Sequence, residues 1–151
     1  MVSYVDHHEP QIAEYIYHLQ QASYAVERDL IAYADFPPLR VTAADIQHEP
    51  GAFLGVWAAE RLLGILSYTV TPPMLDIGRL IVHPSAFRRG IASSLLSAVE
   101  YSATGRHHLT VSTAEKNYPA MSLYQKHGYR ILKRSELPDG LALVRFIKEV
   151  S

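Results

Sequence analysis

The sequence contains no cysteine. This absence excludes disulfides, thiolate metal ligands and covalent intermediates on a cysteine. The sequence also lacks an excess of charge of either sign, because 14 basic residues balance 15 acidic ones and leave a formal net charge of -1 at pH 7. A broad nucleic-acid surface is therefore not expected, and any basic site must be local.

Long hydrophobic runs are missing as well. The longest apolar stretch, residues 52–59, is too short to span a bilayer, and the first ten residues have neither the basic nor the apolar region of a secretion signal. We therefore expect a cytoplasmic protein with no membrane partner.

The sequence contains eight histidines, but their spacing matches no metal-binding motif. The adjacent pairs at 7–8 and 107–108 would point apart on a strand, and no His-Glu-x-x-His motif occurs. We expect no metal site.

The composition is that of a folded protein, with 48% apolar and 19% charged residues over 151 positions. A chain of this length buries a sizeable core without disulfide or metal support. We expect a single domain over residues 1–151.

Apolar residues recur at helical spacing after Pro10 and predict a helix over residues 10–22, followed by a second through Val26, Leu30 and Ile31. Thr42 and Asp45 have the spacing of a capping pair and predict a short helix that ends before residue 50. The first fifty residues are therefore expected to be mostly helix and loop.

From residue 52 the apolar period changes to that of strands. Two runs joined at 59–61 predict a hairpin, with Gly64 marking a bulge in its second strand. A helix of about three turns is expected from Ile91, and another between an N-cap at Asn117 and the turn at Gly128. The remaining strand-like segments are residues 74–82, 108–113, 129–134 and 141–150. This order predicts a mixed α/β domain with one central sheet.

The segment IVHPSAFRRGIASSLL, residues 81–96, joins a strand end to a helix start. Free N–H groups at a helix N-terminus bind anions, and Gly90 lets the backbone approach closely. Arg88 and Arg89 would add donors suited to phosphate, or they are simply solvated arginines beside a turn glycine. Neither the P-loop nor the G-x-G-x-x-G spacing is present, which disfavours ATP hydrolysis and NAD chemistry.

Two motifs together resemble the signatures of the GNAT acetyltransferase superfamily, whose members transfer an acetyl group from acetyl-CoA to an amine. The first is LDIGRLIVHPSAFRRGIASSLL and the second TVSTAEKNYPAMSLYQKHGY, with these positions in register: Val82, Pro84, Gly90, Ala92, Asn117, Ala120, Leu123, Tyr124, Gly128 and Tyr129. The resemblance covers about residues 52–150. It departs at Phe87, where the family usually has Gln or Arg.

The resemblance implies a mostly antiparallel sheet with one parallel pair, flanked by helices. Residues 75–130 would form the acetyl-CoA-binding core, and residues 1–50 a helical region on the acceptor side. The strand backbone at Leu80, Ile81 and Val82 would pair with the pantetheine arm, although their side chains would be core in any α/β domain. The loop and first helical turn would hold the pyrophosphate through Arg88, Arg89, Gly90, Ile91, Ala92 and Ser93.

The resemblance also assigns chemistry to the second motif. Asn117 would cap its helix and contact the cofactor. Tyr124 would donate a proton to the CoA thiolate, because a tyrosine with a pKa of about 10 is protonated at neutral pH; the alternative is a plain core tyrosine.

The base that deprotonates the amine is less clear from the sequence. Ser112 stands where many family members have a glutamate, and a serine could order a water. Asp76 is the next candidate for the base. Alternatively, Asp76 is a surface carboxylate or is paired with Arg79. Lower-ranked candidates for the base are Glu115, His108 and His83. A relay of water molecules without one essential base is equally compatible with the sequence.

The resemblance implies that the acceptor is a primary amine of a small molecule or of a protein. Five residues either line its pocket or pack: Tyr33, Asp35, Phe36, Tyr68 and Met74. The aromatic content favours a small or amino-acid-like amine. Two alternatives to catalysis are a non-catalytic acyl-CoA-binding or sensing module on the same fold, and a nucleic-acid-binding protein, which the net charge disfavours. Dimers are common in the family, which leaves a homodimer open.

Overall fold

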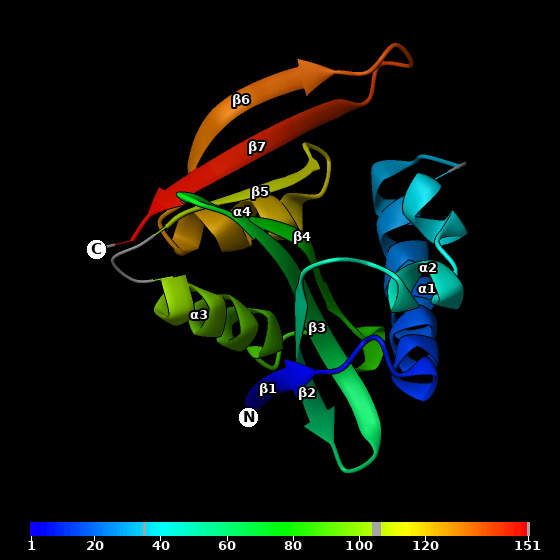
Figure 1. The fold of residues 1–151 in the computed structure, drawn as a ribbon. Helices are drawn as coiled ribbons and strands as arrows, with labels where there is room; N and C mark the ends of the chain where they lie inside the picture. Colours follow the sequence, from blue (N-terminus) through cyan, green and yellow to red (C-terminus); the bar gives the residue numbers. More distant parts are fainter. Residues whose placement is uncertain (35, 104–106, 151) are drawn as a thin grey trace.

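The computed structural model describes residues 1–34, 36–103 and 107–150. These residues form a seven-stranded sheet in the order β1-β2-β3-β4-β5-β7-β6, with helices on both faces (Figure 1). The elements are β1 (Val2–Val5), α1 (Pro10–Ile31), η1 (Pro37–Arg40), α2 (Ala43–Gln47), β2 (Ala52–Ala58), β3 (Arg61–Thr71), β4 (Met74–Val82), η2 (Pro84–Ala86), α3 (Ile91–Ala103), β5 (His108–Ala114), α4 (Tyr118–Lys126), β6 (Arg130–Glu136) and β7 (Ala142–Glu149).

The sheet is antiparallel except between β4 and β5, as the resemblance implied. That parallel pairing aligns Met74 with His108 and ends where Ile77 meets Val111. Beyond Ile77, the described strands give β4 a partner on its β3 side alone. The two parallel strands therefore separate along the second half of β4.

The start of the chain differs from the sequence expectation in two places. Residues 10–31 form one helix instead of two, because one buried stripe runs through the segment and no proline or glycine interrupts it after Pro10. The first fifty residues also include β1, which pairs with β2 at the sheet edge. Four residues with only Val5 buried give no readable strand pattern.

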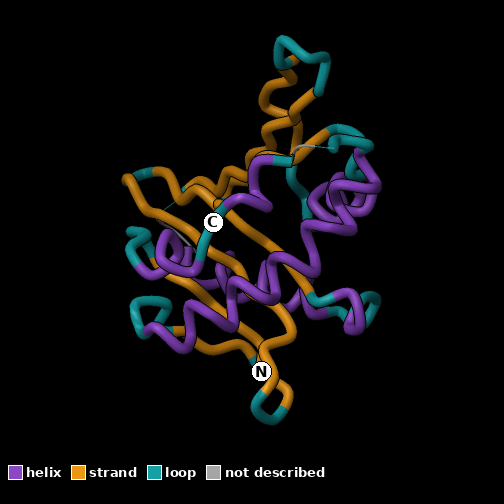
Figure 2. The backbone as a smooth tube through the Cα atoms, turned by 90° about the vertical axis from the view of Figure 1, so that its right-hand side faces the viewer, coloured by secondary structure: helices purple, strands orange, loops and turns teal. Residues whose placement is uncertain are grey.

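Each sheet face has its own core, and Figure 2 shows helices crossing the strands. On one face α1 and α2 pack on the sheet, around Ile16, Leu19, Ile46, Phe53, Ile65 and Ile81. On the other α3 and α4 pack on it, around Leu95, Val99, Leu109, Val111, Tyr124 and Phe146. None of the described helices combines the length and apolar character needed to cross a bilayer.

Gly64 sets how closely α3 approaches the sheet. The register of β2 and β3 shifts beside it, as expected of a bulge, because Val56 pairs with Gly64 while Trp57 pairs with Leu62. A Cβ at Gly64 would lie 2.8 Å from Cγ2 of Ile91, the first residue of α3. The absent side chain lets the N-terminus of α3 rest on β3.

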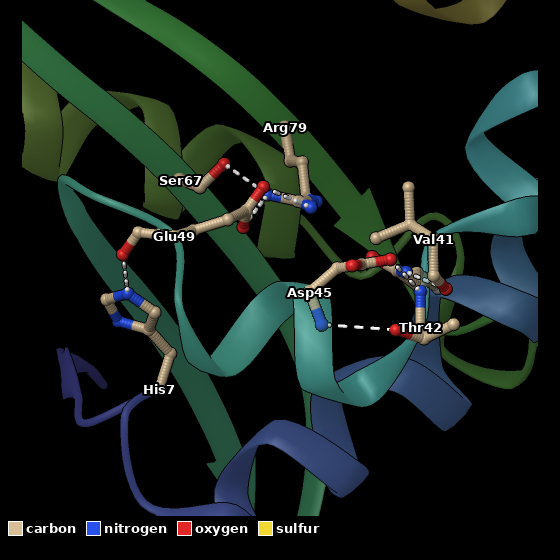
Figure 3. A network of polar contacts seen from close by, with 8 residues as sticks. His7, Val41, Thr42, Asp45, Glu49, Ser67 and Arg79 are labelled. Carbon is tan, nitrogen blue, oxygen red and sulfur yellow. Dashed lines mark hydrogen bonds and ion pairs between the residues drawn. The ribbon is translucent and has the colours of Figure 1, made fainter.

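A polar network ties the chain after α2 to the sheet (Figure 3). Arg79 on β4 donates two hydrogen bonds to Glu49, at 2.7 and 2.8 Å. The carbonyl of Glu49 in turn lies 2.8 Å from Nε2 of His7. Thr42 and Asp45 form the capping box of α2, as predicted.

Candidate active site

A cleft of about 610 Å³ opens beside the unpaired half of β4. It collects four segments that are far apart in the sequence: the C-terminal half of α1, the end of β4, the loop that leads into α3, and α4. Most of the residues expected to bind the donor line it, namely Leu80, Ile81, Val82, Arg88, Gly90, Ile91, Ala92, Ser93 and Asn117, together with Tyr124. The structure thus brings both sequence motifs to one site.

The end of β4 offers this cleft a free strand edge. Leu80 and Ile81 pair with β3 on one side, and no described strand pairs with them on the other. The side chain of Ile81 is buried under α1, so the backbone is what remains available. An extended chain can add to such an edge through main-chain hydrogen bonds.

The loop before α3 is an open turn at a helix N-terminus. Arg88 and Gly90 both have left-handed backbones, with φ of 65° and 76°, and nothing lies within 4 Å of a Cβ placed on Gly90. The helix begins at Ile91, and its first turn contains no acidic residue. The N–H groups of this turn and the positive end of the helix dipole are therefore available to an anion. Arg89 is exposed and is not among the cleft-lining residues.

The side chain of Ser93, in the first turn of α3, contacts the C-terminal end of α4. Its Oγ lies 3.2 Å from Nε2 of His127, and Nδ1 of His127 lies 3.8 Å from Glu100 on α3. His127 is the residue that follows α4. Its link to α3 depends on how the two helices meet.

Asn117 joins α4 to α1. Its Oδ1 accepts from the N–H of Ala120 at 3.3 Å, which confirms the N-cap. Its Nδ2 donates to Oε1 of Glu27 at 3.1 Å. Burial raises the pKa of Glu27, an effect that the hydrogen bond from Asn117 partly offsets. Sequence reasoning missed Glu27, because a single glutamate on an amphipathic helix carries no signal of its own.

Tyr124 lies at the buried end of the cleft. Its ring contacts those of Tyr129 and Phe146, with centroids 5.7 and 5.6 Å away. Tyr124 as a whole is 4% exposed. Burial, followed by the negative charge of Glu27, holds the pKa of Tyr124 far above its usual range. The phenol is therefore protonated at neutral pH. The ring belongs to the core, as one of the two sequence interpretations had it, and the side chain also lines the cleft, where the predicted proton donor would have to lie.

The first two base candidates from the sequence, Ser112 and Asp76, lie outside the cleft-lining set, and so do Glu115, His108 and His83. Asp76 accepts from Oγ1 of Thr110 at 2.7 Å and from Arg145 at 3.3 Å, so the alternative of a pair with Arg79 was wrong. Ser112 is exposed on β5, where it pairs in register with Arg145.

The expected acceptor residues do not form one group. Tyr33 donates to the carboxylate of Asp139 in the β6–β7 turn, whereas Phe36 is buried in the core under α1. Tyr68 packs on the opposite face of the sheet, and Met74 is the first residue of β4, where it pairs with Thr71. Asp35 lies outside the described residues.

A family model described as the acetyltransferase (GNAT) family matches residues 13–129. This chain belongs to the GNAT family. UPF0157 protein YqkA from Bacillus subtilis (strain 168) is 34% identical over 146 residues, which cover 97% of this chain and 43% of that protein. This chain thus spans less than half the length of this relative.

Solved structures show the same fold at low identity. The ribosomal-protein-S18-alanine N-acetyltransferase from Escherichia coli superposes with a TM-score of 0.79 at 16% identity, over 100% of this chain and 94% of that one. For smu.2055 from Streptococcus mutans UA159 the TM-score is 0.81 at 14% identity, over 100% and 99%. An aminoglycoside 6'-N-acetyltransferase complexed with coenzyme A gives 0.74 at 14%, over 98% and 96%.

Proposed function

We propose that this chain is an N-acetyltransferase that moves an acetyl group from acetyl-CoA to a primary amine in a ternary complex. The observation that carries the proposal is the shared cleft, which is lined by the end of β4, the N-terminus of α3 and the side chain of Tyr124. A strand edge, a helix N-terminus and a buried phenol are the three features of this cleft that suit the reaction.

The cleft fits the parts of the donor. The left-handed turn at Arg88 and Gly90 and the first turn of α3 would hold the pyrophosphate, because no side chain at Gly90 fills the approach. The edge at residues 80–82 would pair with the amides of the pantetheine arm. The GNAT enzyme solved with coenzyme A supports this assignment at the level of the fold.

The reaction makes a C–N bond and breaks a C–S bond. The neutral amine attacks the thioester carbonyl carbon, and the tetrahedral intermediate collapses to an amide and a CoA thiolate. Tyr124 would donate its proton to the sulfur and regain one from the new amide nitrogen. Its raised pKa keeps the proton available at neutral pH.

The acceptor is proposed only as a class, a small amine or an exposed amine of a protein. Acetyl-CoA and the purified protein should be assayed for thiol release with a panel of both kinds: polyamines, amino acids, aminoglycosides, and peptides with a free α-amine. Thiol release with a matching acetylated product would support the proposal. Tight CoA binding without release with any amine would favour the non-catalytic module, and absence of CoA binding would reject both.

A further inference from the structure

Glu27 is the only acidic residue among the described residues that line the cleft. It lies on α1, which packs across the sheet from α3 and α4, and it faces Asn117 at the start of α4. The site therefore holds one carboxylate, contributed by a helix outside both sequence motifs.

The two oxygens of Glu27 have different surroundings. Oε1 accepts the hydrogen bond from Asn117 at 3.1 Å, which fixes the side chain. Oε2 has no hydrogen-bond or ion-pair partner among the described residues. Oε2 is not one of the described atoms that are fully buried without a partner. This oxygen is therefore accessible to solvent. A held carboxylate with one open oxygen can accept a proton.

We propose that Glu27 is the general base that takes a proton from the acceptor ammonium group. This inference rests on the proposed acetyl transfer. Glu27 supplies the carboxylate that neither Ser112 nor Asp76 brings to the cleft.

The proton balance follows from this placement. The ammonium form of the acceptor gives one proton to Oε2 of Glu27 and becomes the nucleophile. After attack, the nitrogen loses its second proton to the relay through Tyr124, which protonates the departing sulfur. Glu27 then releases its proton to solvent, so each turnover yields one amide, one free thiol and one proton.

The electrostatic surroundings suit a base that works near neutral pH. Burial raises the pKa of Glu27 toward the working range of a general base. The titratable groups beside it are two buried tyrosines, Tyr24 on its own helix and Tyr124 on α4, and each has a raised pKa. The basic residues that line the same cleft are Arg88 and Lys126. Among the described residues that line the cleft, the carboxylate of Glu27 is therefore the one negative group that can attract an ammonium group, and the phenols beside it are neutral.

The test compares Glu27→Gln with the wild type, using two classes of amine. Gln keeps an oxygen that accepts from Asn117, so the link between α1 and α4 is preserved. With a strongly basic alkylamine, kcat/KM at neutral pH is expected to fall about 100-fold. With an alkoxyamine, which is already uncharged at neutral pH, the loss is expected to be several-fold at most.

The loss for the alkylamine should also shrink as pH rises and the free amine becomes abundant. The matched control is Glu14→Gln, the same change at an exposed position on α1 whose contact is a surface pair with His18. CoA affinity, measured on each variant, verifies that the cleft is intact. Glu27→Asp keeps the carboxylate on a shorter side chain. Its kcat/KM with the alkylamine should lie between those of the wild type and Glu27→Gln.

Equal losses with both amines at every pH would overturn the role as base and leave Glu27 a structural link between α1 and α4. An unchanged rate in Glu27→Gln would overturn it outright. If the wild type releases no thiol with any amine, the failure lies with the proposed acetyl transfer. Failure of the Glu27 proposal alone would instead leave a wild type that releases thiol. The activity of the wild type thus distinguishes the two failures.

Discussion

The hydroxyl of Ser93 lies 3.2 Å from Nε2 of His127, so the first turn of α3 is joined to the C-terminal end of α4 beside the cleft. When Nε2 carries the proton it donates to Ser93, and the hydroxyl proton of Ser93 then remains available to an anion. Ser93→Ala is expected to raise the Kd for CoA about fivefold, the value of one ordinary hydrogen bond. Isothermal titration measures it.

Two controls locate that effect. Ser94→Ala removes a hydroxyl from the next residue, which is exposed and does not line the cleft. It should leave the Kd unchanged. A pantetheine thioester without the pyrophosphate should bind equally to Ser93→Ala and wild type. Equal weakening for this fragment would place the contact of Ser93 elsewhere in the donor.

Tyr124→Phe tests the proton donor. The phenylalanine ring keeps the contacts with Tyr129 and Phe146, so folding and CoA affinity should change little, while kcat falls about 100-fold. Steady-state thiol release provides the measurement. Tyr118→Phe makes the same change at an exposed position of α4 and should have no effect. A Tyr124→Phe enzyme with wild-type turnover would remove the hydroxyl from the mechanism.

Gly64→Ala tests how α3 is seated. The new Cβ would lie 2.8 Å from Cγ2 of Ile91 and 3.2 Å from the carbonyl oxygen of Ile81. We expect a loss of about 1–3 kcal/mol in the free energy of unfolding, the usual cost of overpacking, and weaker CoA binding because the N-terminus of α3 must shift. Urea titration provides the first value.

Gly78→Ala is the matched control for that change, since its nearest contact would be 3.4 Å from Oγ of Ser67. It should be tolerated at nearly wild-type stability. Equal stability of Gly64→Ala and Gly78→Ala would show that α3 adapts freely to the sheet, contrary to the packing described.

Arg79→Met tests the network of Figure 3. Side chains of Arg79 and Glu49 are 11% and 32% exposed, so removal of one partner leaves a carboxylate largely shielded from water. We expect a loss of about 3 kcal/mol in the free energy of unfolding. Breaking the surface pair of Arg130 and Glu149 by Arg130→Met should cost far less. Similar losses for both would show that the network contributes no more than a surface pair.

Glu27 should make stability depend on pH. Burial raises its pKa in the folded state above the ordinary value of 4.5, so folding favours its protonated form. Its contribution is fully present below pH 4.5 and is lost as pH rises through the folded-state pKa. Glu27→Gln does not titrate, and its Tm should exceed that of the wild type near neutral pH and match it more closely in acid. Parallel Tm curves would contradict the raised pKa.

Local signals in the sequence were sufficient for several elements. Asn117 and Gly128 bracket α4 as expected, and Thr42 with Asp45 caps α2. Capping and turn chemistry act within a few residues, so their partners are visible in the sequence. The edge strand β1 and the continuity of α1 were missed, because four strand residues show no period and Val26 to Ile31 suggested a new start.

The sequence by itself determined the family motifs, the turn at Gly90 and the helix that carries Tyr124. Only the tertiary structure decided that β4 leaves β5 after Ile77 and that Glu27 meets Asn117 across 90 residues of chain. An apolar stripe specifies which face of α1 packs on the sheet. Which polar residue at the edge of that stripe then faces the cleft depends on where the helix sits over the strands, and that position is set by the packing of the whole core.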